Sequence, residues 1–271
     1  MYRFVAAGWV PACYSATRVN RSRSSPGPTH MQGTIGLTNY SFPPPPLVSL
    51  PIVGRAERFP VRRIFCVGRN YADHAREMGK DPDREAPFFF TKPCDAIVES
   101  GQVVNYPPET ENFHYEAELV VALGKRGVDI PVDEANDYIF GYAIGNDLTR
   151  RDLQLAARSA GRPWDWGKAF DQSAVIGPIQ VGAPVGDPVK GAIQLTLNGV
   201  TKQSADLADL IWSVPEIVSI LSRSVEIRAG DLVMTGTPAG VGPMNIGDVC
   251  DVSIYGLGTI STTIGPRRPR S

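Results

Sequence analysis

The segment YEAELVVALG, residues 115–124, places two glutamates inside an otherwise apolar run. A short apolar run of this kind predicts a buried β-strand, in which residues two apart point to the same face. Glu116 and Glu118 therefore share one face of the predicted strand. Two like charges side by side repel each other, and burying them unpaired is unfavourable. The segment must place both carboxylates either beside a bound cation or, if the strand lies at a sheet edge, in water.

A third carboxylate ends a second apolar run. Asp147 closes the segment YIFGYAIGND, residues 138–147, immediately before a predicted helix. Side chains at such strand-to-helix junctions are commonly functional. Carboxylate oxygens suit a hard divalent ion, and we expect Mg²⁺, with Mn²⁺ or Ca²⁺ as alternatives. On spacing alone the solvated edge strand is the commoner arrangement, so both interpretations stay open at this point.

The glycine and proline content indicates the fold class. The 271 residues include 27 Gly and 24 Pro, which favours many strands and turns over a helical bundle. The pattern predicts a β-rich α+β domain in which Asn198 and Gly199 form a hairpin turn. Helices are predicted at 70–79, 149–161 and 213–225, and strands at 61–68, 87–93, 96–107, 115–124, 138–147, 171–180, 193–205 and 231–264.

The N-terminal residues differ in composition from the rest. No Asp or Glu occurs before Glu57, and residues 1–30 are rich in Arg and Ser, which predicts a disordered leader. The leader is either a transit peptide for organellar import or an upstream extension of a chain that starts at Met31. Pro11 and the lack of a clear amphipathic helix favour the second interpretation. Residues 31–59, with the tract SFPPPPLVSLP, are predicted to be an extended lead-in, and residues 60–271 a single folded domain.

Charge and cysteine content limit the functional classes. The net charge is -1, so no overall field attracts nucleic acid or a membrane surface. No apolar run approaches the roughly 18 residues that span a bilayer. The four cysteines are scattered without a CxxC pair, which predicts reduced thiols and a cytoplasmic enzyme.

Cationic and amide side chains follow Asp147. Arg151 is four residues beyond Asp147, and Gln154 is three beyond Arg151, so the three can face one direction. The alternative is a solvated helix face. Lys168 lies in RPWDWGKAFDQS among aromatic residues, where a lysine more often lays its stem on apolar surface than takes part in catalysis.

His74 is the best candidate for a general base. His74 and Glu77 are three residues apart on the helix predicted at 70–79, and therefore lie on one face. A carboxylate beside an imidazole fixes its tautomer and raises its basicity, which prepares it to take a proton from water. The commoner outcome for such a pair in isolation is a surface contact.

Taken together, these segments resemble the fumarylacetoacetate hydrolase family, in its fumarylpyruvate hydrolase and acylpyruvase branch. The resemblance covers roughly residues 47–265, in the correct order, and leaves residues 1–30 outside it. It rests on VGRNYADHAREMG, PFFFTKPCDAIV, HYEAELVVALGK, GYAIGNDLTRRDLQ, WDWGKAFDQS and GDLVMTGTPAGVGPMNIGD.

The resemblance implies a fold and an activity. The fold would be a mixed β-sandwich roll. The protein would form a homodimer and act on a small dioxo-acid substrate. The activity would be the Mg²⁺-dependent cleavage of a carbon–carbon bond, most directly of fumarylpyruvate to fumarate and pyruvate. The alternatives are an acylpyruvase that also decarboxylates oxaloacetate, and another 2-oxo-acid lyase or isomerase on the same site. A catalytically silent metal-binding scaffold is a third hypothesis, against which the presence of His74 and Glu77 argues.

The resemblance also assigns residue roles that residue spacing alone left open. It implies metal ligands, a water-activating dyad, donors to the developing oxyanion, and substrate contacts. The implied metal ligands are Glu116, Glu118 and Asp147, and the implied water-activating dyad is His74 and Glu77. The implied oxyanion donors are Arg151, Gln154 and Lys168, and the implied substrate contacts are Lys92 and Thr237. The pocket that receives the distal end of the acyl group is not located by the sequence.

Overall fold

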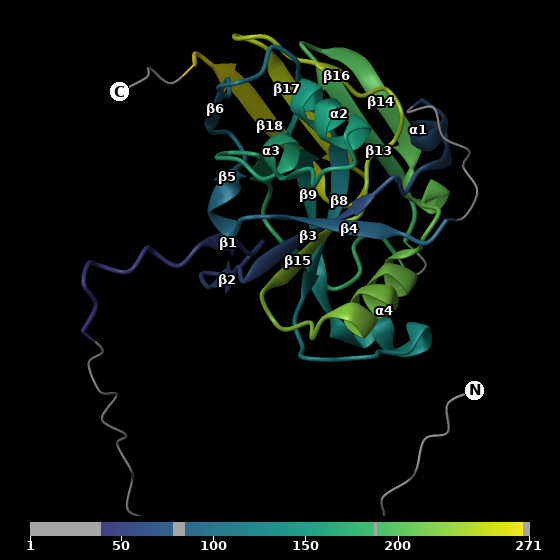
Figure 1. Ribbon diagram of the computed structural model, residues 1–271. Helices are drawn as coiled ribbons and strands as arrows, with labels where there is room; N and C mark the ends of the chain where they lie inside the picture. The colour runs from purple at the N-terminus through teal and green to yellow at the C-terminus, as the bar shows by residue number, and fades with distance from the viewer. Residues whose placement is uncertain (1–38, 78–84, 187–188, 268–271) are drawn as a thin grey trace, which may run out of the picture. The chain divides into compact units, whose positions relative to one another are not determined.

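The computed structural model describes residues 39–77, 85–186 and 189–267 (Figure 1). One compact unit begins at Pro46 and contains every helix and strand described below. The predicted leader, residues 1–30, and Gly79, the predicted end of the first helix, lie outside the described residues. Within the described part of the chain, no helix is both long enough and apolar enough to cross a membrane.

A mixed eight-stranded sheet forms the centre of the unit. Seven strands follow the order β4-β3-β15-β8-β9-β11-β5, and β12 pairs with β9 beside them. Strand β8 is antiparallel to both neighbours, β15 and β9, so it is an interior strand. The bounds are β3 (Arg63–Gly68), β4 (Phe88–Lys92), β5 (Ile97–Glu99), β8 (Ala117–Leu123), β9 (Ile139–Asp147), β11 (Ala174–Ile176), β12 (Gln180–Val181) and β15 (Asp231–Met234).

A five-stranded sheet of order β14-β13-β17-β18-β6 packs on the first. Leu119 and Val121 of β8 share one buried cluster with Ile193 and Val252 of this second sheet, so a single core lies between the two. The two packed sheets confirm the predicted β-rich α+β roll. The bounds are β6 (Val103–Asn105), β13 (Ala192–Leu197), β14 (Val200–Asp206), β17 (Val249–Ile254) and β18 (Gly258–Gly265).

The predicted hairpin turn joins β13 to β14. Asn198 has φ 51° and Gly199 has φ 78°, so both central residues adopt the left-handed conformation that a two-residue hairpin requires. A smaller sheet of order β10-β7-β16 consists of β7 (Phe113–Tyr115), β10 (Thr149–Arg150) and β16 (Gly242–Pro243).

The helices are short and lie outside the sheets (Figure 1). Helix α4 follows the prediction closely: Ser213 and Glu216 form a capping box at its start. Helices α2 and α3 pack together. The bounds are α1 (Ala72–Glu77), α2 (Arg151–Ser159), α3 (Asp165–Lys168) and α4 (Val214–Ser224), with 3₁₀ turns η1 (Cys94–Ala96), η2 (Val132–Tyr138) and η3 (Leu207–Asp209).

Asn70 stands at the start of the helix predicted at 70–79, but α1 begins at Ala72, and the Asn70 side chain binds residues far away in the sequence. Its side-chain amide donates to the carbonyl oxygens of Trp212 and Thr235, at 3.0 and 2.9 Å, and its Oδ1 accepts from the Trp212 N–H. Asn70 therefore ties the end of β3 to two distant loops.

The folded unit begins earlier than the sequence predicted. Strand β1 (Ser49–Pro51) lies in the predicted lead-in, residues 31–59, and pairs with β2 (Arg58–Pro60), which ends one residue beyond it. Leu50, Ile52 and Phe59 are buried in a cluster with residues of the central sheet. The proline-rich stretch concealed this strand, because only the alternation of Leu50 and Ile52 marks it.

Candidate active site

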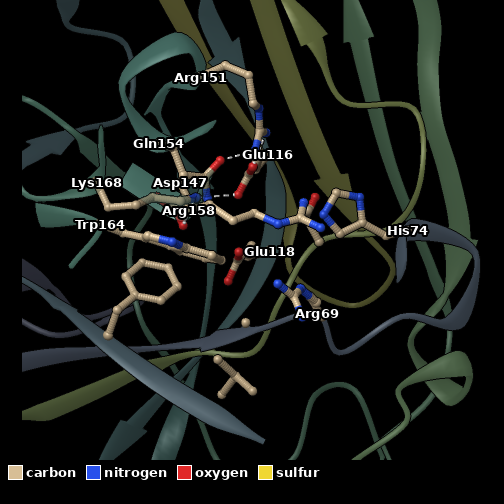
Figure 2. Close-up of a pocket in the computed structure, with 14 residues that line it drawn as sticks. Arg69, His74, Glu116, Glu118, Asp147, Arg151, Gln154, Arg158, Trp164 and Lys168 are labelled. Atoms are coloured by element: carbon tan, nitrogen blue, oxygen red, sulfur yellow. Dashed lines mark hydrogen bonds and ion pairs between the residues drawn. The ribbon is translucent and has the colours of Figure 1, made fainter. Parts of the chain in front are cut away.

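One pocket gathers most of the residues that the sequence singled out (Figure 2). It opens where the ends of β3 and β9 meet α1 and α2. Of the ten predicted site residues, all but Glu77 and Lys92 line it. The lining consists of Val67, Gly68, Arg69, His74, Phe90, Glu116, Glu118, Asp147, Arg151, Gln154, Arg158, Trp164, Lys168 and Thr237.

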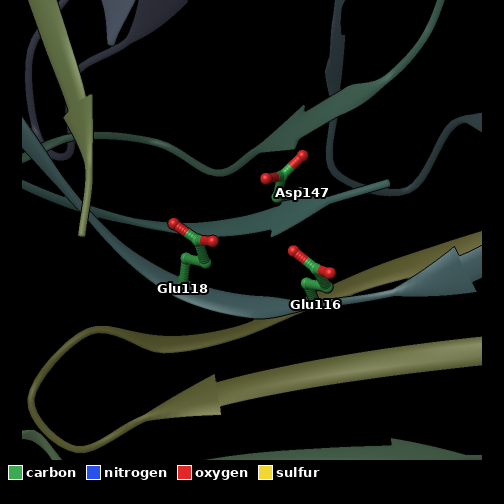
Figure 3. A group of neighbouring side chains, drawn as sticks. All are labelled: Glu116, Glu118 and Asp147. Carbon is green, nitrogen blue, oxygen red and sulfur yellow. The ribbon is translucent and has the colours of Figure 1, made fainter. Parts of the chain in front are cut away.

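Three buried carboxylates converge at the base of the pocket (Figure 3). Glu116 lies between β7 and β8, Glu118 lies on β8, and Asp147 ends the neighbouring strand β9. One carboxylate oxygen from each lies within 4.8 Å of the others, which is a spacing that a single metal ion can bridge. Because β8 is an interior strand and both glutamates are buried, the alternative of a solvated edge strand is wrong.

Glu118 is the carboxyl group of this cluster whose pKa is raised. Burial raises its pKa well above the ordinary value, and the charges of Asp147 and Glu116 raise it further. Its Oε2 accepts a hydrogen bond from the Gly236 N–H at 2.8 Å, which offsets only part of this effect. A bound cation would reverse the effect, so the chemistry of the three donors fits a divalent ion.

Lys168 supplies a positive charge to the other two carboxylates. Its Nζ donates to Glu116 Oε2 at 2.6 Å, to Asp147 Oδ2 at 2.7 Å and to Thr149 Oγ1 at 2.7 Å. Burial lowers the pKa of Lys168, but Asp147 and Glu116 more than offset this, so the net pKa is raised. The side chain is fully enclosed, so the alternative of a lysine with its ammonium in water is wrong.

Arg151 and Gln154 face inward from α2. Arg151 donates to Glu116 Oε1 and to Gln154 Oε1, and both side chains are buried. The alternative of a solvated helix face is therefore wrong. Burial raises the pKa of Glu116, but Lys168 and Arg151 outweigh it and hold the pKa far below the ordinary value.

Lys92 does not lie where a substrate contact was predicted. Its Nζ is fully buried, 2.7 Å from Asp147 Oδ1, and donates to the carbonyl oxygens of Leu148 and Lys168. Strand β4 places it behind Asp147 instead of on the pocket wall. In this structure Lys92 holds a carboxylate of the acidic cluster in place.

Thr237 lies on the pocket wall, in the loop after β15. Its Oγ1 accepts from Gln203 Nε2 at 2.8 Å, which fixes the side chain. The preceding Gly236 has φ +101° and presents its N–H to Glu118. The TGTP segment therefore holds one carboxylate through its backbone and presents a hydroxyl beside it.

His74 lies across the pocket from the cluster, on α1. Its Nδ1 is 3.2 Å from Glu77 Oε2, and the Glu77 carboxylate also accepts from the Gly240 N–H. The His74 side chain is only 8% exposed, so it is not part of a surface pair. Burial lowers the pKa of His74 by more than Glu116 and Glu77 raise it, so the imidazole is neutral near pH 7.

Six further lining residues were not predicted from the sequence, and four of them add aromatic or cationic side chains to the pocket. Phe90 and Trp164 form an aromatic wall, with ring centroids 5.9 Å apart, and Arg69 and Arg158 add two guanidinium groups. Arg158 is seven residues beyond Arg151 on one helix, and this spacing could have placed it on the same face. No local pattern marks Arg69, because its backbone conformation and its packing depend on distant residues.

The fold and the site together define a class of protein. A β-rich roll that gathers carboxylates, buried cations and a neutral histidine in one pocket is typical of an enzyme. Residues 63–265 match the family described as fumarylacetoacetate (FAA) hydrolase C-terminal. The chain belongs to the fumarylacetoacetate hydrolase family.

Individual relatives are similar over most of the chain. A fumarylpyruvate hydrolase of Ralstonia sp is 48% identical over 193 residues, which are 70% of this chain and 99% of that protein. The crystal structure of fumarylpyruvate hydrolase from Pseudomonas aeruginosa, in complex with Mn²⁺ and pyruvate, is 53% identical in sequence and superposes with a TM-score of 0.82. The match covers 84% of this chain and 100% of that chain. The mitochondrial oxaloacetate tautomerase of Homo sapiens is 38% identical over 208 residues, 77% of this chain and 93% of that one.

Proposed function

We propose that this chain is a divalent-metal-dependent hydrolase that cleaves fumarylpyruvate to fumarate and pyruvate. Hydrolysis of a carbon–carbon bond is the activity of its fumarylpyruvate hydrolase relatives. The observation that carries the proposal is the pocket itself, which brings a histidine opposite three carboxylates and their cations. A metal-binding scaffold without activity would need no base at that position.

Glu116, Glu118 and Asp147 would hold the ion. Three carboxylates leave room in an octahedral shell for substrate oxygens and water, and the Mn²⁺ in the Pseudomonas aeruginosa structure supports a divalent ion. Once bound, the ion would withdraw electron density from the 2,4-dioxo group of the substrate. Lys92 positions Asp147 for this role through the 2.7 Å contact between Nζ and Oδ1.

His74 would act as the general base. A neutral imidazole can accept a proton from water, and the lowered pKa keeps His74 in that form near pH 7. Glu77 orients the ring through Nδ1, which leaves Nε2 to take the proton. The activated water would then attack the C4 carbonyl of the substrate.

Arg151, Gln154 and Lys168 would stabilise the oxyanion that forms at this carbonyl. The three side chains converge on one side of the pocket, where Arg151 and Lys168 donate to Glu116 and Gln154 accepts from Arg151 (Figure 2). The loss of one such donor typically lowers the rate by about 10²–10³-fold. Thr237, whose hydroxyl is fixed by Gln203, also lines the pocket and would contact the substrate.

The second candidate is an oxaloacetate tautomerase, an acylpyruvase with oxaloacetate decarboxylase activity, or another isomerase on the same site. The similarity to the oxaloacetate tautomerase of Homo sapiens favours it as part of the breadth of the family. Both candidates use the same metal ligands, so the metal alone does not separate them.

The test compares pyruvate release from fumarylpyruvate, acetylpyruvate and oxaloacetate, each with Mg²⁺, with Mn²⁺ and with a chelator. We expect fumarylpyruvate to give the highest kcat/KM and the chelator to abolish turnover. Oxaloacetate enolisation, followed in the same samples, reports the tautomerase. Faster turnover of oxaloacetate than of fumarylpyruvate would reject the first candidate in favour of the second.

Three further properties are part of this proposal. We expect Mg²⁺ as the physiological ion, a homodimer in solution and a cytoplasmic location. Light scattering on purified protein measures the oligomeric state, and metal analysis after purification without added metal identifies the ion.

A further inference from the structure

The pocket contains a second pair of cations besides Lys168 and Arg151. Arg69 follows strand β3, Arg158 lies in the last turn of α2, and both line the pocket. Figure 2 shows the Arg158 side chain extending across the pocket toward the side that holds Arg69. Burial lowers the pKa of the Arg69 guanidinium, the charge of Arg158 lowers it further, and the charge of Glu85 offsets only part of this, so Arg69 and Arg158 repel each other. Like charges held together at a pocket wall favour an anion between them.

Arg69 is held in place by its surroundings. Its guanidinium carbon is 5.2 Å from the centroid of the Phe88 ring, which is a cation–π contact. The ring lies against Gly68, where an added Cβ would be 2.0 Å from a ring atom, so only glycine permits this packing. Arg69 itself has φ 58°, in the left-handed region that non-glycine residues rarely adopt. Such strain is typically kept at functional sites.

The proposed substrate carries two carboxylates at opposite ends. The first belongs to the 2-oxo-acid end, which would lie at the acidic cluster. The second ends the rigid, extended fumaryl group and must leave water when that group enters the pocket. A buried carboxylate needs a partner, and the planar guanidinium group matches it with two parallel hydrogen bonds.

We propose that Arg69 and Arg158 bind the distal carboxylate of the acyl group, and so select dioxo acids that carry a second negative charge. The inference rests on the proposed function and adds the specificity of the site to it. The acetyl group of acetylpyruvate, by contrast, has no carboxylate to place between the two guanidinium groups. A site built to bind a charged group discriminates strongly against a substrate that lacks it.

The test measures the ratio of kcat/KM for fumarylpyruvate to kcat/KM for acetylpyruvate. Arg69→Gln and Arg158→Gln should each lower this ratio by roughly tenfold, and the double variant by about 10²-fold or more, because hydrogen bonds between charged groups are lost. A general defect in folding or metal binding lowers both rates and leaves the ratio unchanged. Arg162→Gln is the matched control, since Arg162 is an exposed arginine just beyond the same helix, and its ratio should equal that of the wild type.

The binding of the product provides a second measurement. Fumarate should inhibit acetylpyruvate turnover by the wild type competitively, and its inhibition constant should rise by at least tenfold in the double variant. An unchanged ratio in the double variant would overturn the inference, because it would show that the arginines do not distinguish the two acyl groups.

The proposed function can fail separately. If the wild type releases pyruvate from neither substrate, the function is wrong, and calorimetric titration with fumarate alone then tests the arginine pair. Binding that disappears in the double variant supports the pair as a carboxylate site. Equal binding by the wild type and the double variant, or no binding at all, overturns it.

Discussion

Lys168 and Glu116 form a buried ion pair, with Lys168 Nζ 2.6 Å from Glu116 Oε2. The same ammonium contacts Asp147, so one lysine joins two of the three candidate metal ligands. The second oxygens also have cationic neighbours, since Glu116 Oε1 accepts from Arg151 and Asp147 Oδ1 lies 2.7 Å from Lys92 Nζ. Each carboxylate oxygen has two lone pairs, so both carboxylates can still accept a metal ion. Lys168 and a divalent ion can consequently share these carboxylates, and each would offset part of their negative charge.

Removing this lysine should destabilise the metal-free protein. Lys168→Met leaves Glu116 and Asp147 buried with less positive charge, which typically costs about 3–5 kcal/mol in the free energy of unfolding. Urea denaturation in a chelator measures the loss, and saturating Mn²⁺ should restore part of it. Lys202→Met, at an exposed lysine, is the control and should have no measurable effect. An equal stability of the two variants would show that Lys168 is not needed to balance the cluster.

Removing the charge of Glu118 should not destabilise the metal-free protein, in contrast to removing Lys168. Glu118→Gln removes a carboxyl group whose pKa is raised by burial and by two neighbouring acids, while its amide oxygen can still accept from Gly236. We therefore expect the metal-free variant to be at least as stable as the wild type at pH 7. The increase in Tm that Mn²⁺ or Mg²⁺ gives the wild type should be largely lost, because a ligand is missing.

The measurement is a thermal scan with and without metal, and Glu134→Gln, at an exposed glutamate, serves as the control. A metal-induced rise in Tm that is as large in Glu118→Gln as in the wild type would exclude Glu118 as a ligand.

The parts of the site that could be predicted are those with a local pattern. The spacing of Glu116 and Glu118, and of Arg151 and Gln154, follows strand and helix periods, which depend only on neighbouring residues. The position of Lys92 behind Asp147 depends on the pairing of β4 with β3, and the sequence contains no sign of it. The same holds for Arg69, whose place in the pocket is set by Phe88 packing on Gly68. The start of the folded unit was misplaced because prolines masked the short alternation at Leu50 and Ile52.

The position at which the folded unit begins gives a third prediction. Deleting residues 1–30 should leave the Tm and the activity unchanged, because their sequence offers little periodic apolar surface. Deleting residues 1–61 also removes Leu50, Ile52 and Phe59 from a buried cluster, and each such side chain contributes about 1.5–3 kcal/mol. The longer deletion should therefore lower the Tm by many degrees or prevent folding. A chain that begins at residue 46 is the control and should match the shorter deletion.

His74 should be needed for the chemical step more than for binding. His74→Ala should lower kcat by roughly 10²–10⁴-fold, with little change in the Kd of a non-hydrolysable dioxo-acid analogue. Glu77→Gln should have a smaller effect of the same kind, and the two should be non-additive because Glu77 acts through His74. A double-mutant cycle on kcat measures this coupling. Wild-type kcat in His74→Ala would mean that another group activates the water.

The pH dependence of kcat/KM should report His74 and reveal its contact with Glu77. The base works only when neutral, and burial lowers the pKa of His74 below its ordinary value of 6.5. Activity should therefore persist at pH 6.5 and fall as the pH drops through the lowered pKa. The hydrogen bond that His74 Nδ1–H donates to Glu77, together with the Glu77 charge, raises this pKa, so Glu77→Gln should move the acidic limb to still lower pH while the plateau rate falls. Glu134→Gln should leave the limb in place. A limb that moves to higher pH in Glu77→Gln, or does not move at all, would show that the titrating group is not a histidine paired with Glu77.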